Sequence, residues 1–257
     1  MVLVTERALS FGSGAADYER YRPGYPDQLV VQIADYAGRP LRTALEIGAG
    51  TGKATRVFVA AGFDVLATEP DAGMLAELRR HVPSTVRTLQ RPFEGLAGTG
   101  TYDLVFAAAA MHWTDPVDRW PRVAALLEPD GVFASFGGQV GLADREVDGE
   151  VRQAREPFLA DDEVASPDGT PAHAPMQWPG SELVGSVDFT DVRQVMIERR
   201  PLMSAADYLG HLSTISAYRV LPDDVRARAF ASIRDVLPDE VRVVADIVLH
   251  LARRAPA

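Results

Sequence analysis

A glycine-rich turn directly after a short apolar segment constrains the fold of this chain more than any other feature. Residues 43–47, T-A-L-E-I, have the composition of a buried strand, and Gly48, Gly50 and Gly52 follow at once. Glycine tolerates positive φ angles and lets a ligand approach bare backbone. In doubly wound α/β sheets such a turn lies at the carboxyl edge of the strands, where nucleotides bind. The segment therefore predicts a nucleotide-binding α/β fold.

The first half of the chain alternates strand-like and helix-like segments. Strands are expected at 43–47, around Val65 and Ala67, near Val86, at Asp103–Ala108 and at Val132–Phe136. Helices are expected from Pro26 to Gly38, from the glycine turn to about Ala61, from an Asp71 cap through Met74, Leu75 and Leu78, and through Trp120, Val123 and Leu127. Repeated strand–helix units with apolar strands favour a parallel sheet covered by helices on both faces.

The second half is less regular. Residues 161–180 are rich in proline and glycine, which predicts a long loop. A strand is expected at 189–199, a helix from a Ser204 cap through Leu209, Leu212 and Ile215, and another helix after Pro222. Apolar residues then occupy every second position from Val241 to Leu251. This strict period of two predicts one continuous strand, antiparallel to its neighbours.

Composition excludes several classes of function. The chain has 257 residues, 47% of them hydrophobic, and a net charge of −10, which fits one globular domain and disfavours nucleic acid and anionic membrane surfaces as partners. It contains no cysteine, so disulfides, thiolate nucleophiles and cysteine-ligated metals are excluded, and its histidines have no metal-site spacing. We see no membrane-spanning run and no signal peptide, and we expect a cytoplasmic protein.

Two carboxylates indicate which nucleotide the turn accommodates. Glu69 closes the second expected strand 21 residues after Gly48, where a carboxylate can accept hydrogen bonds from ribose hydroxyls. The turn reads G-x-G-x-G before Lys53, not G-x-G-x-x-G, and the chain has no phosphate loop. Glu46 would repel a pyrophosphate but suits a cationic amine. S-adenosylmethionine has such an amine, a sulfonium and no phosphate.

Four motifs occur in order along the chain: E-I-G-A-G-T-G at 46–52, T-E-P-D-A-G-M-L at 68–75, Y-D-L-V-F-A-A-A-A-M-H-W at 102–113 and L-L-E-P-D-G-V-F at 126–133. With them, over about residues 11–138, the chain resembles the class I S-adenosylmethionine-dependent methyltransferases of small-molecule type. The run Y-E-R-Y-R-P-G-Y-P at 18–26 resembles the N-terminal segment of one branch of that family.

The resemblance implies a Rossmann-like, doubly wound seven-stranded sheet of order 3-2-1-4-5-7-6, with strand 7 antiparallel and a variable acceptor-side insertion. It implies a single domain (1–257), with an N-terminal lid and first helix at 1–40. The cofactor-binding core would be residues 41–138, and the acceptor-side region and closing strands residues 139–257.

The resemblance also assigns site residues. Gly48, Ala49 and Gly50 would run past the methionine part of the cofactor, and Glu69 would hold its ribose. Pro70, Asp71 and Met74 would flank adenine, and backbone amides near Phe93, or Glu94, would replace the usual aspartate that reads the adenine amine. Ala107–Ala109 would face the cofactor, Ala108 among them. Tyr18, Tyr21 and Arg22 would close over it, with Arg22 on its carboxylate.

Alternatives remain at several of these positions. Glu46 either meets the cofactor amine or has a structural role, as a salt-bridge partner or by orienting the amides of the loop. The N-terminal segment either contacts the cofactor or merely packs over it. His112, after the expected strand 103–108, is the candidate general base for a hydroxyl acceptor, or else part of a pocket wall beside Trp113.

The expected function is methyl transfer from S-adenosylmethionine to a small-molecule acceptor, with S-adenosylhomocysteine as product and the methylated atom (O, N or C) left open. One alternative is a nicotinamide-dependent oxidoreductase, which the turn spacing and the lack of a Tyr-x-x-x-Lys pair disfavour, since Lys53 is the only lysine. The other alternative is a nucleotide-binding protein without catalysis.

Overall fold

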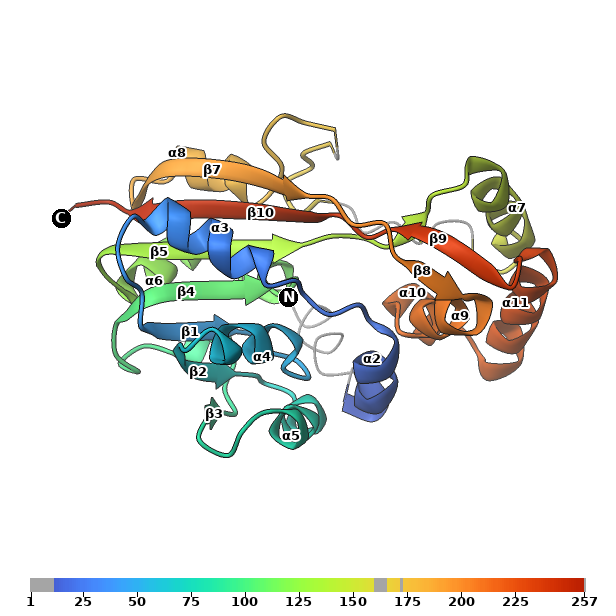
Figure 1. Ribbon diagram of the computed structural model, residues 1–257, viewed down its shortest axis with the longest axis horizontal. Coiled ribbons are helices and arrows are strands. Elements are labelled where there is room, and N and C mark those ends of the chain that lie inside the picture. The colour runs from blue at the N-terminus through green and yellow to red at the C-terminus, as the bar shows by residue number, and fades with distance from the viewer. Residues whose placement is uncertain (1–11, 160–165, 172, 257) are drawn as a thin grey trace.

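Seven strands form the main sheet of the computed structural model, which describes residues 12–159, 166–171 and 173–256 (Figure 1). In spatial order the strands are β3 (Arg87–Leu89), β2 (Asp64–Thr68), β1 (Thr43–Ile47), β4 (Tyr102–Ala108), β5 (Leu127–Gly137), β10 (Ile247–Arg254) and β7 (Phe189–Ile197). The first five run parallel, and β10 is antiparallel to both β5 and β7. The predicted order 3-2-1-4-5-7-6, with an antiparallel strand 7, is confirmed.

Helices cover both faces of this sheet. On one face, apolar side chains of α3 (Gln28–Ala37), α4 (Lys53–Ala60) and α5 (Ala72–His81) belong to one buried cluster. The ring of Phe58 in α4 stacks on Phe106 of β4, with 4.1 Å between ring centroids. On the other face, α6 (Arg119–Ala125), α8 (Gly180–Gly185) and the short helix η2 (Phe93–Gly95) contribute to a second cluster. This layering leaves the carboxyl ends of the parallel strands as the edge where a ligand can enter.

Local signals in the sequence place most helix ends correctly. The carboxylate of Asp71 accepts hydrogen bonds from the amides of Gly73 and Met74, at 2.7 and 2.9 Å, and so begins α5. Gly38 ends α3 with φ of 66°. One expected helix is too long: Leu127 is the first residue of β5, because α6 ends at Ala125 and Leu127 pairs with Tyr102.

A second, three-stranded sheet lies beside the first, in the order β6 (Gly141–Leu142), β9 (Glu240–Val244) and β8 (Leu202–Ser204). Four helices surround it: α7 (Arg145–Arg155), α9 (Ala205–Ser213), α10 (Ser216–Arg219) and α11 (Asp223–Val236). Ser204 caps α9 by accepting from the amide of Asp207, as predicted. The expected helix is again too long, because α9 ends at Ser213 and Ile215 lies outside it.

The prediction of one continuous strand from Val241 to Leu251 is wrong. The segment divides into β9, in the small sheet, and β10, in the main sheet. Between them, the carboxylate of Asp246 accepts a hydrogen bond from the backbone amide of Arg199, at 2.8 Å. At this point a side-chain acceptor takes the place of the backbone carbonyl that a neighbouring strand would supply. Both parts remain extended, which is why the alternation of apolar residues continues across the break.

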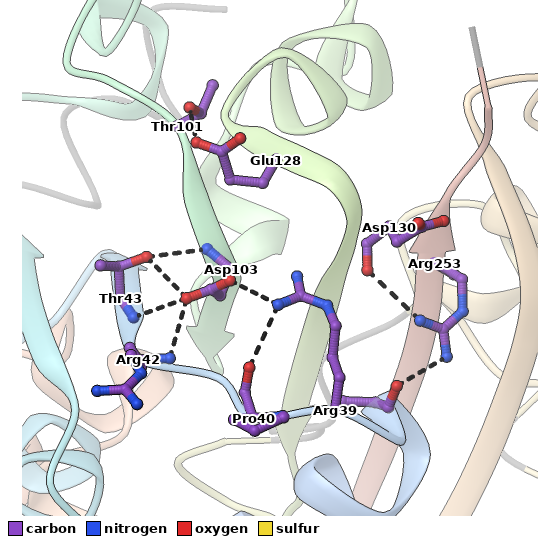
Figure 2. Close-up of polar contacts among 10 residues, drawn as sticks. Arg39, Pro40, Arg42, Thr43, Thr101, Asp103, Glu128, Asp130 and Arg253 are labelled. Carbon is purple, nitrogen blue, oxygen red and sulfur yellow. Dashed lines mark hydrogen bonds and ion pairs between the residues drawn. The ribbon is translucent and has the colours of Figure 1, made fainter.

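Asp103 links two segments at the amino-terminal edge of the main sheet, the edge opposite the carboxyl ends of the parallel strands (Figure 2). Its carboxylate accepts from the guanidinium of Arg39 at 2.7 Å and from the amides of Arg42 and Thr43 at 2.9 and 3.1 Å. Burial would raise the pKa of this carboxyl, but the hydrogen bonds outweigh it and lower the pKa to about 2. Asp103 therefore connects β4 to the chain that enters β1.

Replacing Asp103 with alanine should lower the free energy of unfolding by about 2–3 kcal/mol at pH 7, because a charged acceptor of several hydrogen bonds is lost. Since its pKa is depressed on folding, this stabilisation is present above pH 4 and disappears as the pH falls toward 2. Urea denaturation at pH 7 and pH 3 measures it. Asp64→Ala, which removes an exposed ion pair with Arg87, is the control and should cost less than about 1 kcal/mol. Equal losses for the two variants would contradict this role of Asp103.

In the described part of the chain, no helix has the length and apolar character needed to cross a bilayer.

Candidate functional site

The glycine turn adopts the backbone conformation that its composition predicts. Gly48, Gly50 and Gly52 have φ of 65°, 57° and 85°. A Cβ on Gly48 would lie 2.6 Å from the Cβ of Ala110, and one on Gly52 would lie 2.9 Å from a side-chain carbon of Leu78, so packing forbids a side chain at both. A Cβ on Gly50 would meet nothing within 4 Å. Gly50 thus leaves open space beside its backbone, where a ligand can approach.

A cavity begins at this turn and continues toward the junction of the two sheets. It holds about 700 Å³ of empty space, a volume that includes the part open to solvent. One wall is the turn at 48–51, and another is the N-terminal segment 22–25. Residues 138–140 and 245–247, where the chain passes between the two sheets, also line the cavity, together with Tyr18, the start of α4, Arg199 and the end of β4.

The structure brings some of the predicted residues together at this cavity and not others. Those that line it are Arg22, Gly48, Ala49, Gly50 and Ala108, together with Tyr18. Those that do not line it are Tyr21, Glu46, Glu69, Pro70, Met74, Phe93 and His112. Two of the second group, Glu46 and Glu69, nevertheless contact residues of the turn and its helix directly.

Glu69 supports the turn from the end of β2. Its side chain is buried, with Oε2 accepting from the amide of Gly50 at 2.8 Å and Oε1 accepting from the amide of Asp71 at 2.9 Å. Burial raises the pKa of this carboxyl to about 7, although both hydrogen bonds oppose the rise. A carboxylate has about four acceptor positions, so Glu69 can still accept further hydroxyl donors.

Glu46, at the end of β1, has an unsatisfied oxygen. The residue is fully buried, and its Oε2 accepts from the hydroxyl of Thr55 at 2.5 Å. Its Oε1 has no hydrogen-bond partner among the residues that the structure describes. Burial, with a smaller contribution from the charge of Glu69, raises the pKa of Glu46 to about 8. An unpartnered buried carboxylate oxygen is costly, and a cationic donor from a ligand would satisfy it.

Helix α2 (Ala15–Tyr21) covers the turn like a lid, held by one acidic residue. Glu19 accepts from the hydroxyl of Thr51 at 2.6 Å and from the guanidinium of Arg56 at 2.7 Å, and its carbonyl accepts from Lys53 Nζ at 2.5 Å. The same helix contacts both α5 and α9. It therefore bridges the cofactor side of the main sheet and the helices of the small sheet.

The aromatic and basic residues around the lid separate into two groups. Arg22 donates from Nε to the hydroxyl of Thr214 at 2.7 Å, and its guanidinium lies 5.5 Å from the ring centroid of Tyr18. Both residues line the cavity. Tyr21 instead packs on α9, so closely that a Cβ on Gly210 would lie 2.3 Å from its ring. The predicted contact of Tyr21 with a cofactor stays a prediction.

His112 lies in the short helix η3 (Met111–Trp113), with its ring 4.7 Å from that of Trp113. Burial lowers its pKa to about 4, and the charge of Arg119 adds to this effect. The imidazole is therefore neutral at pH 7 and can accept a proton, but only as a weak base. Its role as general base stays a prediction.

The adenine-side candidates are packed against protein. Met74 and Phe93 are buried, and Phe93 belongs to the cluster beneath β1 and β4. The carboxylate of Glu94 accepts from the amide of Asp115 at 2.8 Å. Their predicted contacts with adenine stay predictions. Across the described residues, no group of His, Asp or Glu side chains is arranged to hold a metal ion.

Sequence reasoning missed the residues that the sheet junction contributes. Tyr25, Gln139, Arg199 and Asp246 all line the cavity. Tyr25 lies within the quoted run 18–26, and so it could have been found. Arg199 and Asp246 carry no local signal, since their position depends on how the two sheets meet.

Fold and turn together define a doubly wound α/β protein with a nucleotide-type site at the carboxyl edge of its sheet. A model of the methyltransferase domain matches residues 45–133. An uncharacterized methyltransferase of Mycobacterium bovis is 32% identical over 232 residues, spanning 90% of this chain and 87% of that protein.

Solved structures agree on the fold. A protein of Anaeromyxobacter dehalogenans, described as a type II methyltransferase, has a TM-score of 0.65 at 24% identity and covers 92% of this chain and 100% of its own. Phosphoethanolamine N-methyltransferase 2 of Haemonchus contortus, bound to S-adenosylhomocysteine, has a TM-score of 0.54 at 15% identity, covering 98% of this chain and 59% of its own. The chain therefore belongs to the class I S-adenosylmethionine-dependent methyltransferase family, and its sequence relatives identify it as a methyltransferase.

Proposed function

We propose that this protein transfers the methyl group of S-adenosylmethionine to a small-molecule acceptor and releases S-adenosylhomocysteine. The observation that carries the proposal is the buried, unpartnered Oε1 of Glu46 next to a turn that leaves open space at Gly50. This pair of features fits a ligand with a cationic amine and no phosphate. The Haemonchus contortus protein, which shares the fold, holds S-adenosylhomocysteine and supports the same reading.

The residues present have distinct roles in this proposal. Glu69 would accept the ribose hydroxyls, Glu46 the amine, and Arg22 would pair with the carboxylate of the cofactor. The cofactor supplies a methyl carbon that its sulfonium already activates. The chain would then contribute alignment and exclusion of water, with α2 and the segments between the two sheets lining the cavity. We propose a small molecule, and not nucleic acid, as acceptor because the chain carries a net charge of −10, which disfavours contact with a phosphate backbone.

Calorimetric titration with S-adenosylmethionine, S-adenosylhomocysteine and NADH tests the proposal. Binding of both sulfur nucleosides without binding of NADH is the expected result. Binding of NADH alone would overturn the cofactor assignment and favour an oxidoreductase. Product formation with S-adenosylmethionine and a panel of acceptors then separates an enzyme from a protein that only binds the nucleotide.

Cofactor binding at pH 7 should release close to one proton from Glu46, because a carboxyl with a pKa of about 8 becomes ionised beside the arriving amine. The same linkage makes the apparent Kd of S-adenosylhomocysteine fall as the pH rises from 6 to 8. Titration in buffers of different ionisation enthalpy counts the protons.

Glu46→Gln is the matched control and should abolish this share of the release. Methylthioadenosine lacks the amine, so its binding at pH 7 should release protons from Glu69 alone. That release is about half a proton, because the pKa of Glu69 is about 7. Equal proton release by the two ligands would contradict the assignment of Glu46 to the amine.

A further inference from the structure

The cavity carries a charge opposite to that of the whole chain. Of the described residues that line it, Arg22, Lys53 and Arg199 are basic and Asp246 is acidic, in a chain of net charge −10. Lys53 forms an ion pair with Glu19, with 3.6 Å between Nζ and Oε1. Asp246 forms an ion pair with Arg200, which does not line the cavity. Two guanidinium groups, those of Arg22 and Arg199, remain to be explained.

Both guanidinium groups bond to neutral partners. Arg22 donates to Thr214, and Arg199 donates from one terminal nitrogen to the carbonyl of Gly24 at 2.7 Å. Within the ranges that the structure describes, neither side chain forms an ion pair. A guanidinium has five N–H donors, so each group keeps donors for a ligand. S-adenosylmethionine supplies one carboxylate, which we assigned to Arg22. The cofactor therefore provides no anionic partner for Arg199.

Arg199 enters the cavity from the side of β7. It follows β7, and along the carboxyl edge the sheet runs from β1 through β4, β5 and β10 to β7. The axes of β1 and β7 are thus four strand spacings apart, which is about 19 Å. The backbone of Arg199 is held there because its own amide donates to Asp246 in the linker after β9, while its guanidinium reaches back to the carbonyl of Gly24. With the cofactor at the glycine turn, the β7 side is the part of the cavity left for a methyl acceptor.

Tyr25 lies between these two sides. Its ring packs edge-on against Phe136 near the end of β5, with 5.1 Å between centroids, and the residue lines the cavity beside Gly24. Gly24 itself is exposed, and a Cβ there would meet nothing within 4 Å, so the cavity is open to solvent at this point. Burial raises the pKa of the Tyr25 hydroxyl far above its usual range, and the nearby Tyr18 and Glu46 add to the rise, while the charges of Arg22 and Arg199 act in the opposite direction. The hydroxyl is therefore a hydrogen-bond donor at every working pH.

We propose that Arg199 and Tyr25 form a subsite that binds a carboxylate group of the methyl acceptor. This inference rests on the proposed function, because it presumes that the glycine-turn side of the cavity holds the cofactor. A guanidinium and a phenol hydroxyl together supply charge-assisted donors suited to a carboxylate. The carboxylate that binds Arg199 could instead be that of the cofactor. The experiment below distinguishes an acceptor carboxylate from the cofactor carboxylate.

The test titrates small monocarboxylic and dicarboxylic acids, each paired with its amide, into the protein saturated with S-adenosylhomocysteine. At least one acid should bind while its amide does not. Arg199→Gln should weaken the binding of that acid by at least about tenfold. The Kd of S-adenosylhomocysteine should stay within twofold of its original value.

Two variants complete the design. Tyr25→Phe keeps the ring packing and removes only the hydroxyl, so it should weaken acid binding by about five- to tenfold and leave the melting temperature unchanged. Arg193→Gln is the matched control on β7, the strand that Arg199 follows, because Arg193 is exposed and pairs with Asp191. It should change neither acid nor cofactor binding.

Three results would overturn the subsite. The first is that no acid binds better than its amide, and the second is that Arg199→Gln and Arg193→Gln have equal effects. The third is that Arg199→Gln weakens S-adenosylhomocysteine but not methylthioadenosine, which would assign Arg199 to the cofactor carboxylate. If wild-type protein binds no S-adenosylhomocysteine, the proposed function fails, and titration of acids into the free protein still tests the subsite.

Discussion

Replacing Glu69 with alanine should weaken the binding of S-adenosylhomocysteine about a hundredfold. Two hydrogen bonds to ribose hydroxyls would be lost, each to a charged acceptor and each contributing about 1.5 kcal/mol. Their sum of about 3 kcal/mol corresponds to roughly two orders of magnitude in Kd. The amides of Gly50 and Asp71 would also lose their acceptor, so the turn itself would become less ordered. Calorimetry at pH 8, where Glu69 is ionised, measures the effect.

Glu77→Ala is the matched control for Glu69. Glu77 is also a buried acid and lies on the neighbouring helix α5, but it pairs with Arg80 and His81 at the surface. Its loss should leave cofactor binding unchanged. In the wild type, binding should also weaken below pH 7 as Glu69 takes up a proton, and Glu69→Ala should lose this part of the pH dependence and keep the part that Glu46 contributes. A wild-type Kd in the Glu69 variant would show that this carboxylate only supports the turn.

Substituting Gly50 with valine should reduce cofactor binding by about a hundredfold or more, the second large effect that we expect. A side chain at Gly50 would occupy the open space beside the turn, and its φ of 57° strains any L-residue. The strain should also lower the free energy of unfolding by about 1–2 kcal/mol. Thermal melting and calorimetry report the two effects separately.

Gly38→Val is the control that separates the two effects of Gly50→Val, namely backbone strain and a side chain that occupies the ligand space. Gly38 has φ of 66°, and a Cβ there would also meet nothing within 4 Å, but it ends α3 away from the cavity. The two variants should lose similar stability, and only Gly50→Val should lose binding. Normal binding by Gly50→Val would mean that the cofactor does not pass this residue.

Features set by neighbouring residues were predictable from the sequence. The cap of α5 at Asp71, the end of α3 at Gly38 and the positive φ angles of the turn depend on a few adjacent positions, and all agree with the structure. The strand order followed from the resemblance, and the buried strands supported it. The unsatisfied state of Glu46 could be suspected but not established, since it depends on Thr55 and on the fully buried position of the side chain.

Features set by distant residues were not predictable. The break between β9 and β10 has no signal in the alternation of apolar residues, and the hydrogen bond found there joins Asp246 to the amide of Arg199, 47 positions away. Tyr21 matched the family segment, yet its ring faces Gly210 of α9. Arg199 was missed for the same reason, since only the meeting of the two sheets places it at the cavity.

Gly138 and Asp246 mark the point where two segments that connect the sheets cross. A Cβ on Gly138 would lie 1.8 Å from the carbonyl oxygen of Asp246, so the two backbones touch and a side chain at Gly138 would force one of them to move. Gln139 and Arg199 line the cavity beside this crossing. Under the proposed function, exchange of these two side chains would change the acceptor side of the cavity and leave the crossing intact, whereas an insertion in either segment would displace it.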